Sequence, residues 1–581
     1  MKKLMLGNEA IARGIYEAGG KVVSSYPGTP STEITEYIAK YEEIYSEWAP
    51  NEKVAVEVAS GAAIAGARAF SAMKHVGLNV AADPLYTASY IGVNGGLVLT
   101  VADDPGMHSS QNEQDSRNHA IGAKVPMLEP SDSAECKEFT KLAFDLSEEF
   151  DTPVIIRVTT RIAHSRSLVE EEPRKEVPVR IYEKNPQKNV MMPAMAIKRH
   201  VFVEERTKKL TEYAENCKIN TVEINEGAKF GIITAGDCYM YAKEALKENA
   251  SYLKLGMVNP LPIKLIKDFA EKFNEVIIIE ELDGVIEKHC RSLGINCRGK
   301  DIFGYLGEFS QETVKNKLLN IYPKVNSVDL EIPPRPPALC AGCPHRSLFY
   351  ALKTIGCYVS GDIGCYTLGA LPPLSSIDTC ICMGASVSAL HGAAIARGKD
   401  FSKNAVAVIG DSTFIHSGIT GIIDIAYNKG LSTVIVLDNS ITGMTGHQNN
   451  PANGLTIKNE PTTAVDLEAL ALAVGFKSVR VVDPYKMADT TAVIKEELAK
   501  PEPSLIISRR PCVLLKNVKH NRPLYVSGDT CKGCKMCMRI GCPAIEFKDG
   551  KAKIESTLCV GCKVCTELCK FGAIKGANED V

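Results

Sequence analysis

Eight of the twenty cysteines in this chain lie between Cys531 and Cys569. They form two similar sets in which three cysteines, each separated from the next by two residues, are followed by a fourth: Cys531, Cys534, Cys537 and Cys542, then Cys559, Cys562, Cys565 and Cys569. The repeated spacing indicates an internal duplication. In a chain of 581 residues this pattern predicts metal or redox chemistry and disfavours a disulfide scaffold.

Three cysteines in steps of three with a more distant fourth is the spacing that binds a [4Fe-4S] cluster in bacterial ferredoxins, where the fourth thiolate serves the other cluster. That rule predicts one cluster held by Cys531, Cys534, Cys537 and Cys569, and a second held by Cys542, Cys559, Cys562 and Cys565. The alternative is a pair of zinc sites, but these usually have two separated CxxC arms. Two neighbouring clusters carry single electrons. The rest of the chain is therefore expected to produce electrons in pairs.

Three α/β units precede the cysteine-rich tail and must position that chemistry. Apolar runs alternating with helical segments predict mostly parallel sheets. Residues 166 to about 225 are charged and predict a linker containing a helix, and the proline-rich stretch 332–337 ends the second unit. A tightly packed helix is predicted over the Ala- and Gly-rich residues 60–73. The predicted strands are 21–26 and 154–158 in the first unit, 230–234 and 275–279 in the second, and 405–409, 433–437 and 505–508 in the third.

Two polar side chains follow neighbouring strands of the third unit. Strand 405–409 runs into Gly410-Asp411-Ser412, and strand 433–437 runs into Asp438-Asn439-Ser440-Ile441. The carboxyl ends of parallel strands meet at one edge of a sheet, where α/β sheets bind ligands. Oxygen ligands of this kind suit Mg²⁺, which in turn holds a phosphate. The alternative is an ordinary turn between strand and helix.

This pattern resembles the thiamine diphosphate motif, in which GDG is followed some 25 to 30 residues later by Asn. By that resemblance Gly410 belongs to the cofactor site, Asp411 and Asn439 bind Mg²⁺ by their side chains, and Ile441 binds it by its backbone carbonyl. Ser412 replaces the final glycine of the motif. Thiamine diphosphate also needs a carboxylic acid beside its aminopyrimidine, and an apolar setting suits such proton exchange. Glu57, in an apolar run of the first unit, is the candidate, with a structural ion pair as the alternative.

The whole chain resembles the 2-oxoacid:ferredoxin oxidoreductases, and most closely the alpha subunits of the indolepyruvate type. Besides the cysteine-rich tail, the resemblance rests on four blocks in this order: Tyr26-Pro27-Gly28-Thr29-Pro30-Ser31-Thr32-Glu33, Glu57-Val58-Ala59-Ser60-Gly61-Ala62, Cys340-Ala341-Gly342-Cys343-Pro344-His345-Arg346 and Gly361-Asp362-Ile363-Gly364-Cys365-Tyr366. It implies three doubly wound parallel-sheet units, two binding thiamine diphosphate and one transketolase-C-like, followed by a ferredoxin-like α+β domain with two [4Fe-4S] clusters.

The resemblance assigns a function to each segment of the chain. It implies a pyrimidine-binding domain at 1–170, a linker at 171–225, a transketolase-C-like domain at 226–332, a diphosphate- and Mg-binding domain at 338–515 and the cluster domain at 520–581. In this cofactor class the site usually lies between the first and third units, within one chain or across a dimer, and a dimer is expected.

The resemblance also places individual residues. Thr29 would lie near the substrate carbonyl, and Arg117 would pair with the substrate carboxylate, although a surface arginine is the commoner case. Cys340 and Cys343 form a CxxC, which could indicate a redox or metal site, but with no second pair nearby their loop is expected to close over the cofactor. His345, in the same loop, would contact the diphosphate or be an ordinary hydrogen-bonded histidine, and Cys365 would line the same site. The roles of His108, His416 and His447, in polar loops, stay open. The cysteines outside these motifs are expected to be small buried side chains.

The activity implied is oxidative decarboxylation of an aryl pyruvate, indolepyruvate, with coenzyme A as acyl acceptor and electrons passing through the clusters to an external ferredoxin. A smaller beta subunit, in an α2β2 assembly, is the implied partner. The alternatives are another 2-oxoacid, such as phenylpyruvate or a branched-chain acid, or a subunit that only transfers electrons. A non-oxidative decarboxylase would have no use for two clusters.

Composition excludes other classes of protein. The net charge of -2, from 67 basic and 69 acidic residues, disfavours nucleic acid as the main partner. Because no run of 18 apolar residues exists, no transmembrane helix is expected. Charges within the first nine residues argue against a signal peptide, so a cytoplasmic location is expected.

Overall fold

The computed structural model describes residues 1–324, 330–333 and 335–576. The chain divides into two compact units, Met1–Asp329 and Leu330–Val581. Of the predicted proline-rich boundary, Pro334 lies outside the described residues, as do residues 577–581 of the predicted cluster domain. Within residues 1–324, 330–333 and 335–576, no helix is long and apolar enough to cross a membrane.

The first unit begins with a seven-stranded sheet of order β12-β6-β7-β5-β4-β2-β3, parallel except for β12. Its side chains alternate between two buried cores: Leu97 and Leu99 of β5 face one core and Val98 faces the other. Burial on both faces is what parallel sheets require. The strands are β2 (Val22–Ser25), β3 (Tyr45–Trp48), β4 (Ala69–Lys74), β5 (Leu97–Asp103), β6 (Met127–Leu128), β7 (Val154–Thr159) and β12 (Met257–Asn259).

Helices cover both faces of this sheet. A short antiparallel ladder of β1 (Lys2–Leu6) and β8 (Arg166–Glu170) joins the first residues of the chain to the segment that follows β7. The helices are α1 (Gly7–Glu17), α2 (Thr32–Ile38), α3 (Glu52–Ile64), α4 (His75–Val80), α5 (Ala82–Ile91), α6 (Arg117–Ala123), α7 (Ser133–Phe150) and α8 (Thr160–His164).

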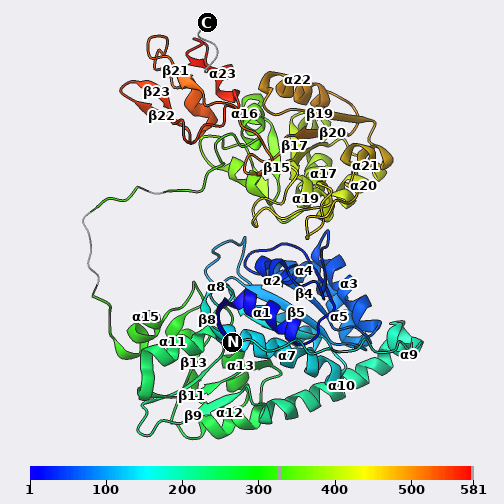
Figure 1. The fold of residues 1–581 in the computed structure, drawn as a ribbon, viewed down its shortest axis with the longest axis vertical. Coiled ribbons are helices and arrows are strands. Elements are labelled where there is room, and N and C mark those ends of the chain that lie inside the picture. Colours follow the sequence, from blue (N-terminus) through cyan, green and yellow to red (C-terminus); the bar gives the residue numbers. More distant parts are fainter. Residues whose placement is uncertain (325–329, 334, 577–581) are drawn as a thin grey trace. The chain divides into compact units, whose positions relative to one another are not determined.

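A second, five-stranded sheet of order β14-β13-β10-β11-β9 completes this unit, parallel except for β9. The long helix α10 (Pro193–Asn216) precedes it and packs against α5 and α12 (Figure 1). The strands are β9 (Thr221–Glu223), β10 (Phe230–Thr234), β11 (Ala250–Lys254), β13 (Val276–Ile279) and β14 (Cys297–Arg298). The helices are α9 (Pro186–Asn189), α11 (Gly236–Leu246), η1 (Lys247–Asn249), α12 (Ile263–Ala270), α13 (Val285–Ser292), α14 (Lys300–Phe303), α15 (Gln311–Val314) and the π-helix η2 (Lys315–Leu319).

Two edge strands cross the boundaries expected from the sequence. Strand β9 lies inside the predicted linker yet pairs with β11, and β12 follows β11 in the chain yet pairs with β6. One apolar core contains residues of both sheets, among them Leu99 and Ile278. The predicted boundary at residues 225 and 226 therefore does not separate two independent layers.

The second unit contains a six-stranded, fully parallel sheet of order β16-β15-β17-β18-β20-β19. Its strands are β15 (Tyr358–Gly361), β16 (Thr379–Cys380), β17 (Ala405–Gly410), β18 (Thr433–Asp438), β19 (Ser478–Val482) and β20 (Ser504–Arg509). Its helices are α16 (His345–Ile355), η3 (Cys365–Ala370), α17 (Ala385–Arg397), α18 (Lys399–Ser402), α19 (Asp411–Thr413), the π-helix η4 (Phe414–Gly418), α20 (Ile419–Tyr427), α21 (Leu467–Ala473) and α22 (Met487–Leu498).

The cysteine-rich tail folds as a duplicated α+β segment against this unit. Its small core includes Ala351 of α16 and Met487 of α22, so it packs on the parallel-sheet domain. The elements are β21 (Tyr525–Val526) paired with β24 (Ile574–Lys575), β22 (Ile545–Lys548) paired with β23 (Lys551–Ile554), η5 (Met536–Ile540) and α23 (Val564–Leu568).

The seven predicted strands are confirmed, since they correspond to β2, β7, β10, β13, β17, β18 and β20. The predicted helix over 60–73 is wrong. Helix α3 begins before it, at Glu52, and ends at Ile64, and β4 begins at Ala69. Gly66 between them has a φ of 103°, which favours glycine and ends the helix.

Candidate active site

The predicted metal-binding residues meet at the carboxyl edge of the second unit's sheet. Gly410 pairs with Leu437, so β17 and β18 end side by side and the residues that follow them, Asp411 and Asn439, lie at one edge. Both are buried. The Asp411 carboxylate accepts hydrogen bonds from the backbone N–H groups of Ser412 (2.7 Å) and Ser440 (2.8 Å). These bonds hold the two loops together.

The electrostatics of Asp411 fit a bound cation. Burial, followed by the neighbouring Asp438 carboxylate, raises the pKa of Asp411 to about 7, despite hydrogen bonds from Ser412 and Ser440 that favour the charged form. A divalent cation would offset this cost of ionisation. The Asn439 amide oxygen, which accepts the Ile441 N–H at 3.3 Å, is a second oxygen of the kind that Mg²⁺ uses. The donor set present therefore fits Mg²⁺.

Two details explain the local sequence. A Cβ at Gly410 would lie 2.8 Å from the Tyr366 ring, so this position requires glycine. Ser412, where the motif has glycine, is accommodated because its hydroxyl oxygen accepts a 3.0 Å hydrogen bond from Thr442. Ser440 adopts a φ of 61° and turns the chain between Asn439 and Ile441.

His345, the first residue of α16, contacts this edge directly. Its Nε2 lies 3.3 Å from the Asn439 amide nitrogen, and its ring packs edge-on against Tyr366. Burial lowers the pKa of His345 to about 4, so the ring is neutral and can accept a hydrogen bond from the amide. The structure thus brings His345 together with Asn439.

Cys340 and Cys365, both predicted to contact the cofactor, lie in the same neighbourhood. The Cys365 sulfur lies 3.4 Å from where a Cβ of Gly443 would be, in the loop after Asn439. Burial, followed by Cys512 and Cys340, raises the pKa of the Cys365 thiol. Cys512 itself donates its backbone N–H to the Asn439 carbonyl at 3.0 Å. Their role in cofactor binding stays a prediction.

Each predicted set of four tail cysteines lines one cavity. The first cavity is lined by Cys531, Cys534, Cys537 and Cys569, and the second by Cys542, Cys559, Cys562 and Cys565. Backbone N–H groups point at the sulfurs, from Ala573 to Cys569 at 3.2 Å and from Leu524 to Cys559 at 3.4 Å. Four cysteine thiols from the tail around each cavity, with N–H donors to sulfur, fit a [4Fe-4S] cluster.

The second cavity adjoins the loop that carries His345. Gly342, Cys343 and Arg346 line it together with the cysteines. Arg346 is buried, and its guanidinium donates to the carbonyls of Ile540 and Gly541, directly before Cys542. One short loop therefore contacts both the Asp411–Asn439 edge and the second cysteine cavity.

In the first unit, Thr29 lies in the loop after β2. It is half-buried, and the loop is held by a 2.7 Å hydrogen bond from the Asn8 side chain to the Pro30 carbonyl. Lys74, at the end of β4, reaches the same loop: its Cγ lies 3.4 Å from where a Cβ of Gly28 would be. Burial lowers the pKa of Lys74. The sequence analysis did not single out this half-buried cation, because one lysine at a strand end carries no motif.

Glu57 lies on the surface of helix α3 and not in the expected apolar setting. Its side chain is 45% exposed within this unit and forms an ion pair with Lys53 on the same helix. Asn51 caps the helix by accepting the Val54 N–H at 2.9 Å. Ala55, Val56 and Ala59 face the core while Glu57 faces outward, because α3 is a helix and not the end of a strand.

Arg117 does not have the free guanidinium that its predicted role requires. It is 1% exposed, pairs bidentately with Asp115 and donates to Glu280 at 2.7 Å. It also donates to the carbonyls of Glu281 and Asp283, so every guanidinium nitrogen has a partner. The prediction that it binds a substrate carboxylate is corrected, because its charge is used to join the two sheets of the first unit.

The structure gives each of the three other histidines a local neighbour. His108 is half-exposed, 3.3 Å from Glu308. His416 is buried, and its Nδ1 lies 2.9 Å from the Ser417 hydroxyl. His447 lies 3.9 Å from the Cys512 sulfur, in the loop after Asn439.

Comparison with known proteins identifies the family. The indolepyruvate oxidoreductase subunit IorA of Archaeoglobus fulgidus is 40% identical over 100% of this chain and 98% of its own length. The proteins of that name from Pyrococcus horikoshii and Thermococcus kodakarensis are 40% and 41% identical, over 100% and 99% of this chain and 97% of each relative. The chain belongs to the indolepyruvate oxidoreductase subunit IorA family.

Family models agree with this membership. Residues 13–225 match the pyruvate flavodoxin/ferredoxin oxidoreductase thiamine diphosphate-binding model, and residues 362–508 match the C-terminal TPP-binding domain of thiamine pyrophosphate enzymes. A 2-oxoglutarate:ferredoxin oxidoreductase from Magnetococcus marinus, solved with 2-oxoglutarate, coenzyme A and succinyl-CoA, is 19% identical with a TM-score of 0.47, covering 55% of this chain and 65% of that one. This member of the IorA family is thus a subunit of a thiamine diphosphate-dependent 2-oxoacid:ferredoxin oxidoreductase.

Asp362, to which the sequence analysis gave no role, lies at the end of a strand next to the Asp411–Asn439 edge. Asp362 follows β15, the strand next to β17, in a second Gly-Asp pair. Its carboxylate accepts the backbone N–H groups of Gly384 (2.8 Å) and Ser386 (2.9 Å), and so fixes the start of α17. The repeated Gly-Asp after a strand was the available signal.

Proposed function

We propose that this chain catalyses the oxidative decarboxylation of an aryl pyruvate, indolepyruvate, with coenzyme A to give aryl-acetyl-CoA and CO₂. In this proposal the electrons pass through two [4Fe-4S] clusters to ferredoxin. The observation that carries the proposal is the loop 340–346. Through His345 it contacts Asn439, and through Cys343 and Arg346 it lines the cavity of Cys542. A thiamine site and an electron acceptor are what an oxidative enzyme needs side by side.

The residues at the sheet edge are assigned by what their atoms can bind. Asp411 and the Asn439 amide oxygen would hold Mg²⁺, with the Ile441 carbonyl as a third ligand, and Gly410 leaves room for the Tyr366 ring beside them. His345, neutral at physiological pH, would fix the orientation of the Asn439 amide, so that its oxygen faces the cation. When bound, thiamine diphosphate would supply the electron sink for loss of CO₂.

In the first unit we propose Glu57 as the carboxylic acid beside the aminopyrimidine and Thr29 as a contact of the substrate carbonyl. Half of the Glu57 side chain is exposed, and its partner Lys53 is also on the surface, so the carboxylate is accessible to a ligand. Lys74, beside the Thr29 loop, replaces Arg117 as the proposed partner of the substrate carboxylate. Its Nζ donates to the Ser109 carbonyl at 2.9 Å, which leaves two N–H donors for an anion.

The tail cysteines would hold the clusters in the crossed pairing that the spacing predicts. Each cavity contains three cysteines of one set and the fourth of the other. Because Cys343 and Arg346 line the cavity of Cys542, the cluster there would accept electrons first, and that of Cys569 would pass them to ferredoxin. The buried Arg346 would also offset the negative charge of the nearer cluster.

The partners follow from the family and the chemistry. The relatives are named as subunits, so we propose a smaller beta subunit in an α2β2 assembly, with coenzyme A as co-substrate. The thiols of both cluster sites must stay reduced, which supports a cytoplasmic location.

The test is an anaerobic assay of ferredoxin reduction by the chain and its partner subunit with a panel of 2-oxoacids. Indolepyruvate should have the highest kcat/KM, and activity should require coenzyme A. A preference for 2-oxoglutarate, phenylpyruvate or a branched-chain acid would overturn the substrate assignment. If none of the tested 2-oxoacids supports ferredoxin reduction, the chain acts only as an electron carrier.

A further inference from the structure

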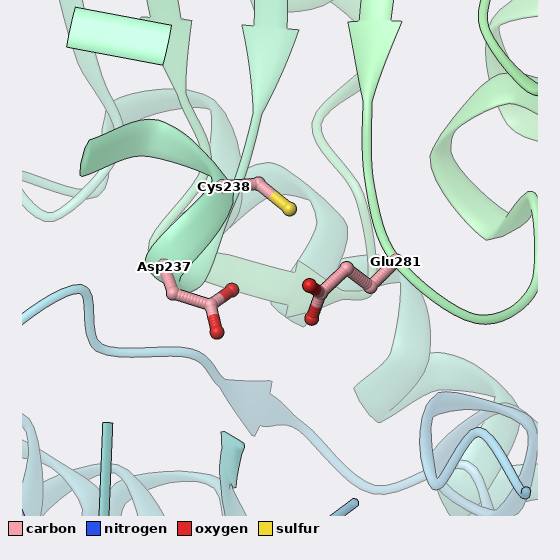
Figure 2. Close-up of side chains that lie close together, drawn as sticks. All are labelled: Asp237, Cys238 and Glu281. Carbon is pink, nitrogen blue, oxygen red and sulfur yellow. The ribbon is translucent and has the colours of Figure 1, made fainter. Parts of the chain in front are cut away.

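Three buried side chains in the first unit converge on one point. Asp237 and Cys238 lie in the first turn of α11, and Glu281 follows β13. Each offers one ligand atom, and the three atoms all lie within 4.8 Å of one another. Figure 2 shows both carboxylates and the sulfur directed toward a common centre. The three residues are 3%, 2% and 4% exposed, so the cluster is closed to solvent.

One oxygen of this cluster has no protein partner. The Glu281 Oε1 accepts the Phe309 N–H at 2.5 Å, but Oε2 is buried and makes no hydrogen bond within the described part of the chain. Asp237 uses one oxygen to accept the Thr159 hydroxyl at 2.5 Å. Buried polar atoms nearly always have a hydrogen-bond partner, so an unpaired oxygen aimed into the cluster points to a missing ligand.

The charges around the cluster point to a cation. Arg157, a buried base of this region, pairs through its Nε with Asp103 and through its Nη1 with Glu129, both at 2.7 Å. Lys300, a second buried base, donates to the Glu280 carbonyl at 2.7 Å. A cation bound between the three side chains would offset the charge of the two carboxylates and the sulfur.

We propose that Asp237, Cys238 and Glu281 form a structural site for a thiophilic divalent cation, zinc. Zinc accepts cysteine sulfur and carboxylate oxygen together, whereas Mg²⁺ and Ca²⁺ prefer oxygen alone. The ion would join α11, the loop after β13 and, through Thr159, the end of β7. It would therefore fix the second sheet against the first. The site is independent of the proposed activity.

Zinc content and zinc coordination in the full-length chain test this site. The chain, purified anaerobically from zinc-supplemented cells, should contain about one zinc ion per chain that resists dialysis. Its zinc K-edge absorption spectrum should show one sulfur at about 2.3 Å and oxygens at about 2.0–2.2 Å. The edge is specific for zinc, so iron in the tail does not interfere.

Variants assign the zinc to these side chains. Cys238→Ser and Glu281→Gln should lose most of the zinc, whereas Cys290→Ser, which removes another buried thiol of the same half, should keep it. The wild-type spectrum decides the matter if the first two variants do not fold. If the purified chain contains no zinc, the proposal is wrong, and the alternative is that the carboxyl groups are protonated and hydrogen-bonded within the cluster. Zinc bound by sulfur alone, which would place it in the tail, would overturn it equally.

Discussion

Replacing Arg117 by methionine should destabilise the first unit without weakening substrate binding. The substitution would remove the positive charge between two buried carboxylates, Asp115 and Glu280, while the new side chain roughly fills the space. Removing one partner of a buried ion pair costs about 3–5 kcal/mol. Arg157 remains 3.9 Å from Asp115, and Glu280 still accepts two backbone N–H groups of α13, so we expect the lower part of that range.

For a unit that spans residues 1–329, 1 kcal/mol shifts Tm by about 1.5 °C, so a loss of about 3 kcal/mol corresponds to about 4–5 °C. The assay is thermal unfolding followed by circular dichroism and calorimetry. The matched control is Arg161→Met, which breaks a half-exposed pair with Glu308 worth about 0–1 kcal/mol. In the same series Lys74→Met should raise KM for the 2-oxoacid. The reasoning is refuted if Arg117→Met unfolds like the control and raises KM instead.

Three further predictions concern the proposed site. Asp411→Ala should lose thiamine diphosphate and Mg²⁺ on gel filtration, whereas Asp424→Ala, an exposed carboxylate of the same unit, should retain them; equal retention would contradict the metal assignment. Glu57→Gln should lower kcat about 10²- to 10⁴-fold with the cofactor still bound, and a change below about tenfold would exclude its acid–base role. Cys542→Ser and Cys569→Ser should each halve the iron content, but only Cys542→Ser should stop 2-oxoacid-dependent reduction of the remaining cluster. Identical behaviour of the two would argue against the order of electron transfer.

Sites whose residues are linked by a local sequence pattern could be predicted from the sequence. The crossed assignment of Cys542 and Cys569 follows from a local repeat, and the structure gathers those residues in two cavities. The Asp411–Asn439 edge was also predictable, because parallel strands that end in polar residues place them at one edge.

Interactions between residues far apart in the sequence could not be predicted from it. Arg117 was recognised as an arginine suited to a carboxylate, but its partner Glu280 lies 163 residues further along the chain. The edge strands β9 and β12 are too short to show the alternation of apolar and polar residues that predicts a strand. Cys238 was interpreted as a small buried side chain, since nothing local indicates that Glu281 faces it.

The Ala- and Gly-rich segment 60–73 was misassigned for a related reason. Small residues suit both a packed helix and a buried strand, so composition alone does not locate the break between α3 and β4. Glu57 was likewise placed in an apolar setting because its neighbours in sequence are apolar. On helix α3, Ala55, Val56 and Ala59 face the core while Glu57 faces the surface.

The most direct test of the proposed oxidative mechanism is a single turnover of the complex without ferredoxin. The chain and its partner are mixed anaerobically with indolepyruvate and coenzyme A, and the absorbance of the iron-sulfur clusters and the release of CO₂ are followed together. The proposed mechanism predicts bleaching of the clusters in step with CO₂ release and formation of the aryl-acetyl thioester. Release of CO₂ with no bleaching of the clusters would contradict it.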